Sequence, residues 1–332
     1  MTLMSRIAPQ LIALAALVAL VSVFYPGFLS VDVQNDRLVG PVIDILKRSA
    51  PVALLAVGMT LVIATRGIDL SVGTIMAICG AAAAWALTAG LGAGAALALA
   101  LGAGLVAGLW NGVLVAVVGI QPFVATLILM TMGRGVAQLI TEGRILTFTD
   151  PGFSWLGSGT ALGLPVPVWI WLATAAAAAL LMRRTALGLL VEAVGINRRA
   201  ALLAGVNATV LLIAVYVASG FCAALAGIIV TADIRGADAN NAGLWLELDA
   251  ILAVVIGGNS LLGGRFSIAA SVLGALIIQT ISAGILLAGF ASEYNLIIKA
   301  GLVLVILILQ SPRIASEWRL WRDSHRAQGD RA

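Results

Sequence analysis

The chain has 332 residues, of which 61% are hydrophobic and only 10% are charged, and its formal net charge is +4. Soluble domains carry about 25% charged residues, so this chain has too few charges to cover the surface of a water-soluble fold. The single histidine, His325, excludes histidine-based zinc motifs and a Ser-His-Asp arrangement, and the basic residues stand mostly beside apolar runs, which favours membrane topology over nucleic-acid binding as their role.

Apolar runs long enough to cross a hydrocarbon core of about 30 Å recur along the whole chain. They predict an all-α, polytopic membrane helical bundle of about ten transmembrane helices in a single domain over residues 1–332, because a β-barrel would show short alternating segments instead. The first run is interpreted as a retained span, since it is longer than the apolar region of a signal peptide. In chain order, the expected spans cover residues 7–29, 52–64, 74–87, 93–118, 123–140, 166–182, 210–231, 250–262, 268–288 and 296–310.

Two connections between these spans stand out. Residues 65–73, TRGIDLSVG, form a polar link flanked by glycine between the second and third spans. Residues 141–165, TEGRILTFTDPGFSWLGSGTALGLP, are rich in Gly, Pro, Ser and Thr, and this composition predicts a loop.

The basic residues predict the orientation of the chain. One group can share a side of the membrane with the charged C-terminal tail, residues 311–332: Arg6, Arg183, Arg184, Arg198, Arg199 and Arg265. An even number of spans places both termini on that side, and the excess of positive charge makes it cytoplasmic. Five basic residues fall on the other side, so the bias is imperfect: Arg37, Lys47, Arg48, Arg144 and Arg235.

Polar residues at membrane depth are the candidates for a translocation pathway. They include Asp69, Ser71, Asn111 and Gln121. An ionisable residue inside a membrane is costly and therefore suggests a function, but the favoured interpretation of Asp69 is structural, with its carboxylate hydrated at the cytoplasmic interface or capping the next helix. The amides of Asn111 and Gln121 could bind a polyol or bond between helices, and both interpretations stay open.

The segment 185–208 contains an unusual polar stretch, VEAVGINRRAALLAGVN, in an otherwise apolar chain. Asn197 is a suitable N-cap, and Gly205 can end the helix in the left-handed conformation. The two-turn helix between them is too short to be stable alone, so it needs a surface, either on the chain itself or on a partner. No P-loop is present, because Lys47 and Lys299 are followed by Arg and Ala; an ATPase would therefore be a separate polypeptide.

Other classes of function are less well supported. The spans lack the chain of buried carboxylates and basic residues that proton-coupled transporters often have. A secondary, ion-coupled transporter of small polar solutes remains the alternative, because backbone carbonyls can hold sodium. No nucleophile motif occurs, so we expect no catalytic residue, cofactor or metal site.

The segment 185–208 resembles the cytoplasmic coupling loop of permease subunits of bacterial ABC-type sugar importers, the ribose/galactose-type family. The matching residues are Glu192, Ala193, Gly195, Asn197, Ala200, Ala201 and Gly205. The link TRGIDLSVG is similar to a second hallmark of the family, which usually has a Gly-Gly pair where this chain has Arg66 and Gly67. The segments NGVLVAVVGIQPFVATL and VVIGGNSLLGG also match, and the likeness covers residues 9–310.

The likeness is greatest to galactofuranose-type permeases, in TADIRGADANNAGLWLELDAILAVVIGG and IQPFVATLILM. It implies a bacterial inner-membrane permease that imports a monosaccharide, galactofuranose or a similar sugar. The implied partners are ABC ATPase subunits, a periplasmic sugar-binding protein and a second, related permease. The ATPase subunits, and not this chain, would hydrolyse ATP. In this arrangement segment 185–208, from here on the coupling segment, contacts the ATPase. An outer loop either docks the binding protein or is an ordinary solvated connection, and its polar residues are Asp233, Asp238, Asn240, Asn241 and Glu247.

Overall fold

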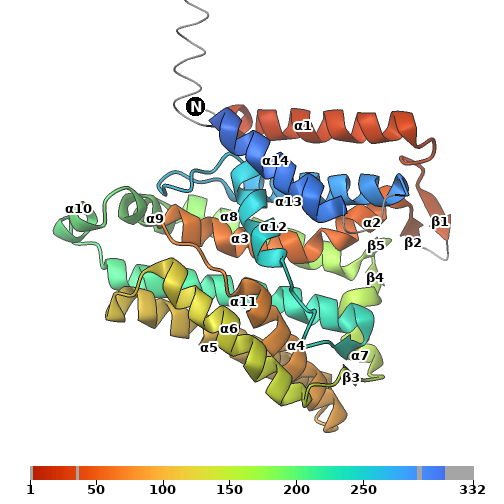
Figure 1. Ribbon diagram of the computed structural model, residues 1–332, viewed down its shortest axis with the longest axis horizontal. Helices are drawn as coiled ribbons and strands as arrows, with labels where there is room; N and C mark the ends of the chain where they lie inside the picture. The colour runs from red at the N-terminus through yellow and green to blue at the C-terminus, as the bar shows by residue number, and fades with distance from the viewer. Residues whose placement is uncertain (1–2, 35–36, 290–293, 311–332) are drawn as a thin grey trace, which may run out of the picture. The chain divides into compact units, whose positions relative to one another are not determined.

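The computed structural model describes residues 3–34, 37–289 and 294–310, and these are mostly helical, as the all-α prediction expects (Figure 1). The predicted charged tail, residues 311–332, lies outside the described residues. The helices are α1 (Leu3–Phe24), α2 (Pro41–Arg48), α3 (Ala50–Ala64), α4 (Val72–Thr88), α5 (Gly92–Val113) with its π-helical extension η1 (Leu114–Val118), α6 (Pro122–Thr141), α7 (Pro151–Ser158), α8 (Val166–Arg184), α9 (Leu187–Ile196), α10 (Arg198–Leu203), α11 (Ala208–Ile234), α12 (Leu246–Ile256), α13 (Ile268–Leu287) and α14 (Tyr294–Gln310).

Three antiparallel pairs of very short strands connect the helices. They are β1 (Asp32–Gln34) with β2 (Arg37–Val39), β3 (Leu146–Thr147) with β6 (Gly236–Ala237), and β4 (Thr160–Ala161) with β5 (Leu164–Pro165). The β3–β6 pair joins the connection after α6 to the end of α11.

The chain divides into two compact units, Met1–Thr280 and Ile281–Ala332. The first contains α1 to α12 and most of α13, and the second contains the end of α13 and α14. The residues of both candidate functional regions belong to the first unit.

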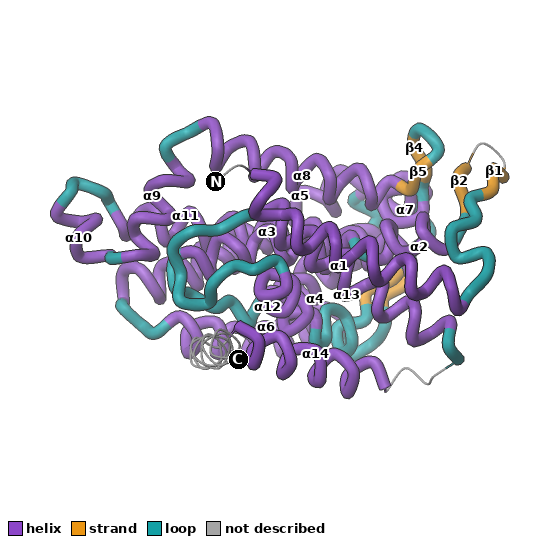
Figure 2. Tube along the Cα trace, turned by 90° about the horizontal axis from the view of Figure 1, so that it is seen from above, coloured by secondary structure: helices purple, strands orange, loops and turns teal. Residues whose placement is uncertain are grey.

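The centre of the first unit is α11, which packs against α3, α4, α5 and α7 (Figures 1 and 2). Every residue of α3 except Pro51 is buried, because this helix is apolar on all sides and has no face suited to solvent. Small residues let α5 and α11 approach closely: a Cβ atom at Gly220 would lie 2.2 Å from the carbonyl oxygen of Gly104.

Six helices are long and apolar enough to cross a membrane in the described part of the chain. They lie at Ile7–Phe24, Gly92–Val118, Pro122–Thr141, Val166–Arg184, Ala208–Ile234 and Ile268–Leu287. The pair α2 and α3, bent by 41°, would be a seventh if it forms one broken span. Each of the ten expected spans overlaps a helix, but the count of about ten crossings is not confirmed and stays a prediction.

The sequence-based prediction was wrong in two places. Residues 141–165 are not simply a loop, because they contain α7, which begins where Asp150 Oδ1 accepts a hydrogen bond from the Phe153 amide at 2.8 Å. The Asp-Pro pair at 150–151 is a helix start signal that the loop-like composition obscured. The eighth expected span, 250–262, ends as a helix at Ile256, because Gly257 and the left-handed Gly258 turn the chain away.

The close crossing of α5 and α11 leads to a prediction. Gly220→Ala should lower the free energy of unfolding by about 1–3 kcal/mol, because the new methyl group would force the two helices apart. Thermal unfolding of the detergent-solubilised protein measures this. Gly94→Ala, also on α5, is the control, since a Cβ there meets nothing within 4 Å. Equal unfolding temperatures for both variants would contradict the proposed close crossing.

Candidate functional site

The first candidate region is the break between α3 and α4, residues 65–71. A helix that stops in the buried interior of a protein leaves backbone groups that water cannot satisfy, so the protein must supply their partners. The amides of Thr65, Arg66 and Gly67 bond back to the last turn of α3 at 2.9–3.1 Å. On the other side, Thr126 Oγ1 of α6 accepts the Leu70 amide at 3.2 Å and lies 3.1 Å from the Ile68 carbonyl oxygen.

Asp69 is the centre of a buried polar cluster at this break. Its Oδ1 accepts from the Ser71 amide at 3.0 Å and from the Ser71 hydroxyl at 2.6 Å. Its Oδ2 accepts from the Ser219 hydroxyl of α11 at 2.8 Å, and Asn111 Nδ2 of α5 donates to Ser71 Oγ at 2.8 Å. All four residues are fully buried, so we call Asp69, Ser71, Asn111 and Ser219 the polar cluster.

The cluster brings together three of the four residues predicted for the pathway. Gln121 lies apart from them, exposed at the start of α6. Asp69 is neither hydrated nor a helix cap in the strict sense, since Ser71 occupies the N-cap position of α4 and Asp69 binds its amide. The structure adds Ser219, which the sequence analysis missed. It lies 150 residues from Asp69, and no local pattern connects the two.

The second candidate region is the coupling segment, where the predicted short helix is confirmed as α10. Asn197 Oδ1 accepts from the Ala200 amide at 3.1 Å, which makes it the N-cap. Gly205 is left-handed with φ 85°, its amide bonds to Leu202 O, and the Val206 amide bonds to Ala201 O. This is a Schellman ending, so both ends of α10 are closed by hydrogen bonds.

One side of the coupling segment packs on the chain itself. A Cβ atom at Gly195 would lie 1.9 Å from Ala64 O, so α9 meets the end of α3 at backbone distance. Glu192 lines a cavity of about 460 Å³ together with Arg183 and Ser267. Ala193 is half-buried and Ala201 is buried.

The other side of the coupling segment is uncovered. Ala200 is exposed, as are two apolar residues of α10, Leu202 and Leu203, and Leu203 is 91% exposed. An isolated apolar surface residue is ordinary, but here two lie together on a helix that is fixed at both ends. The helix therefore presents a preformed apolar surface beside the charges of Arg198 and Arg199.

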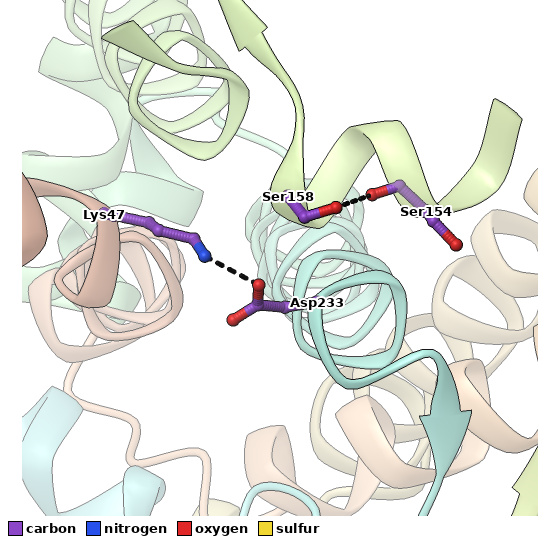
Figure 3. Close-up of polar contacts among 4 residues, drawn as sticks. All are labelled: Lys47, Ser154, Ser158 and Asp233. Carbon is purple, nitrogen blue, oxygen red and sulfur yellow. Dashed lines mark hydrogen bonds and ion pairs between the residues drawn. The ribbon is translucent and has the colours of Figure 1, made fainter. Parts of the chain in front are cut away.

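The loop 233–247 lies at the opposite end of α11 from the coupling segment (Figures 1 and 2). With 27 residues, α11 is about 40 Å long. Figure 3 shows Lys47 of α2 reaching Asp233 at the end of α11, at 2.7 Å, beside Ser154 and Ser158 of α7. Both partners of this pair are partly exposed, so the pair contributes little to the stability of the fold.

The remaining predicted residues of this loop differ in exposure. Asp238 accepts the amides of Asn240 and Asn241 and the side-chain amide of Asn241, and mainly this last bond lowers the pKa of Asp238 below its usual value. Gln138 of α6 donates to Asn240 Oδ1 at 2.7 Å, and Arg134 donates to two carbonyls of the loop. Glu247 is buried close to Gly73 of α4, whereas Asn240 and Asn241 are exposed.

No group of three or more His, Cys, Asp or Glu side chains that could hold a metal ion occurs in the part of the chain that the structure describes.

The polar cluster leads to a second prediction. Ser219→Ala should lower the free energy of unfolding by about 1–3 kcal/mol, because one oxygen of the buried Asp69 carboxylate loses its donor. Chemical denaturation of the purified protein measures this. Ser158→Ala is the control, since that exposed hydroxyl bonds only within its own helix. If the two variants are equally stable, the Ser219–Asp69 bond does not contribute to the fold.

Comparisons with known proteins agree with this architecture. A family described as branched-chain amino acid transport system / permease component matches residues 42–307. The galactofuranose transporter permease protein YtfT of Escherichia coli is 62% identical over 308 residues, which cover 93% of this chain and 90% of that protein. The fructose import permease protein FruF of Bifidobacterium longum is 41% identical over 94% of this chain and 89% of its own length. The ribose import permease protein RbsC of Escherichia coli is 40% identical over 92% of this chain and 93% of its own length.

No solved structure matches the chain significantly. The family match extends from α2 to α14, and the relatives align with more than nine tenths of the chain. The chain therefore belongs to this family of transport-system permease components.

Proposed function

We propose that the chain is the membrane-spanning subunit of an ATP-driven importer that moves a monosaccharide, galactofuranose or a similar sugar, from the periplasm to the cytoplasm. The observation that carries this proposal is the 62% identity to a galactofuranose transporter permease over 93% of the chain. The fructose and ribose import permeases at about 40% identity support a sugar as the cargo. ATP hydrolysis belongs to a partner chain, because this sequence has no P-loop.

The coupling segment is the contact for the partner ATPase. Support comes from α10, which is capped at both ends and leaves Leu202 and Leu203 uncovered. The residues that form or shape this contact are Glu192, Ala193, Gly195, Asn197, Ala200, Ala201 and Gly205. In this proposal α9, α10 and both termini face the cytoplasm, as the distribution of basic residues indicates.

The loop 233–247 is the contact for the periplasmic binding protein. It lies at the other end of α11, as two partners on opposite sides of a membrane require (Figure 1). Asn240 and Asn241 are exposed for direct contact, while Asp238 and Glu247 order the loop from within and Asp233 is paired with Lys47.

A second, related permease completes the pathway in this proposal. Gln121 is the exposed candidate for contact with sugar. The buried residues Asp69, Ser71 and Asn111 do not contact the sugar in this proposal. Their hydrogen bonds fix the positions of α4, α5 and α11, which line the pathway.

Reconstitution tests the function. Proteoliposomes that contain this chain, its second permease and its ATPase should take up labelled galactofuranose only when ATP is inside and the loaded binding protein is outside. A hydrolysis-deficient ATPase in the same assembly is the control. Uptake by this chain alone, driven by an ion gradient, would show a secondary transporter and overturn the proposal.

Replacing Leu203 tests the ATPase contact separately. Leu203→Asp should weaken binding of the ATPase at least about tenfold, because it places a charge in an apolar contact. Co-purification and surface plasmon resonance of the assembled permease measure the affinity. Leu162→Asp is the matched control, since Leu162 is 89% exposed in the turn between β4 and β5. Unchanged affinity for Leu203→Asp would place the ATPase elsewhere on the chain.

A further inference from the structure

Arg66 has an unfavourable backbone conformation at the break between α3 and α4. Its φ is 64°, in the left-handed region where a side chain crowds the backbone and glycine is preferred. A strained residue persists when its surroundings hold it in place, and such strain is concentrated at functional positions.

The side chain of Arg66 reaches the coupling segment. Its Nη2 donates to the carbonyl oxygen of Ile196 at 2.7 Å. Ile196 is the last residue of α9, so this carbonyl has no partner within the helix and lies at the negative end of the helix dipole. The guanidinium group therefore bonds the break directly to the end of α9.

A third segment closes around this contact. The Gly264 amide donates to Ala64 O at 2.9 Å, directly before the break. A Cβ atom at Gly263 would lie 2.4 Å from Arg66 Cγ, so the stem of the arginine lies against the turn 263–264. Arg66 is exposed, but it contacts the turn through its stem and α9 through its guanidinium group.

A simpler role as a helix cap does not account for the strain. Ile196 is 58% exposed, so this end of α9 is open to solvent, and an exposed helix end can be completed by water. A glycine would remove the backbone cost at residue 66. What glycine could not supply is a side-chain bond between the break and α9.

The break, in turn, contacts the helices of the bundle. Asp69, three residues after Arg66, holds Ser219 of α11 and, through Ser71, Asn111 of α5. A displacement of α9 that carries Arg66 with it therefore acts on the segment that carries the polar cluster.

We infer that Arg66 is a positioning residue that binds the coupling segment to the break and so suppresses ATP hydrolysis that is not accompanied by transport. This inference rests on the proposed function. The arginine does not contact sugar or nucleotide; it limits how far α9 can move while the break stays in place.

The test uses the complete reconstituted assembly and the variant Arg66→Gly. We expect ATP hydrolysis without the loaded binding protein to rise, and the number of sugar molecules imported per ATP to fall about threefold or more. The unfolding temperature should stay the same or increase, because glycine removes the backbone strain. A lower sugar-to-ATP ratio without a lower unfolding temperature would separate this role from a structural one. A structural role would lower both the ratio and the unfolding temperature.

Three variants sharpen the test. Arg66→Asn tolerates the left-handed conformation but is too short to reach Ile196, so it should behave like Arg66→Gly. Arg66→Lys keeps the charge and one donor, and should restore coupling in part. Leu162→Gly is the control for the backbone effect, because Leu162 is also left-handed, with φ 53°, but lies in the turn between β4 and β5, outside both proposed partner contacts. It should leave the sugar-to-ATP ratio unchanged.

The outcomes are distinct. An unchanged ratio in Arg66→Gly, or a lower ratio accompanied by lost stability or lost ATPase binding, overturns the role of Arg66 and leaves the proposed function intact. Absence of ATP-dependent uptake in the unmodified assembly overturns the proposed function itself.

Discussion

The structure depends on one constraint: the backbone groups released where a helix stops in the buried interior must find partners within the protein. Residues 65–71 interrupt the buried run of α3 and α4, and their partners come from three other helices. Thr126 of α6 contacts the backbone at Ile68 and Leu70, Ser219 of α11 binds Asp69, and Asn111 of α5 binds Ser71. Each of these helices must therefore lie at a defined distance from the break.

The glycines of the bundle help to meet the same constraint, because they let the helices approach closely. Serine, aspartate and asparagine have short side chains, so the helices that carry them must pack closely before they can bond. Gly104 and Gly220 allow this between α5 and α11, and Gly58 allows it between α3 and Ser219, whose Cα would lie 2.8 Å from an added Cβ. Close packing of small residues and the buried polar cluster are thus two parts of one arrangement.

Hydropathy predicted the helical fold class, and each expected span overlaps a helix, because burial in lipid is a property of each segment by itself; the number of membrane crossings stays a prediction. The caps of α10 were also predictable, since Asn197 and Gly205 act on residues within one turn. The bond between Asp69 and Ser219 was not, because it depends on how two distant helices pack. Nor was the contact from Arg66 to Ile196, in which a residue with a left-handed backbone bonds to a partner 130 residues away.

The closed ends of α10 have a consequence for how fast and how tightly partners associate. A short helix that folds only on contact loses conformational entropy at that moment, and its affinity falls accordingly. Here the Asn197 cap and the Schellman turn at Gly205 order the six residues of α10 before any partner arrives. A partner that binds α10 contacts a helix that is already formed, so repeated release and rebinding need not include a folding step.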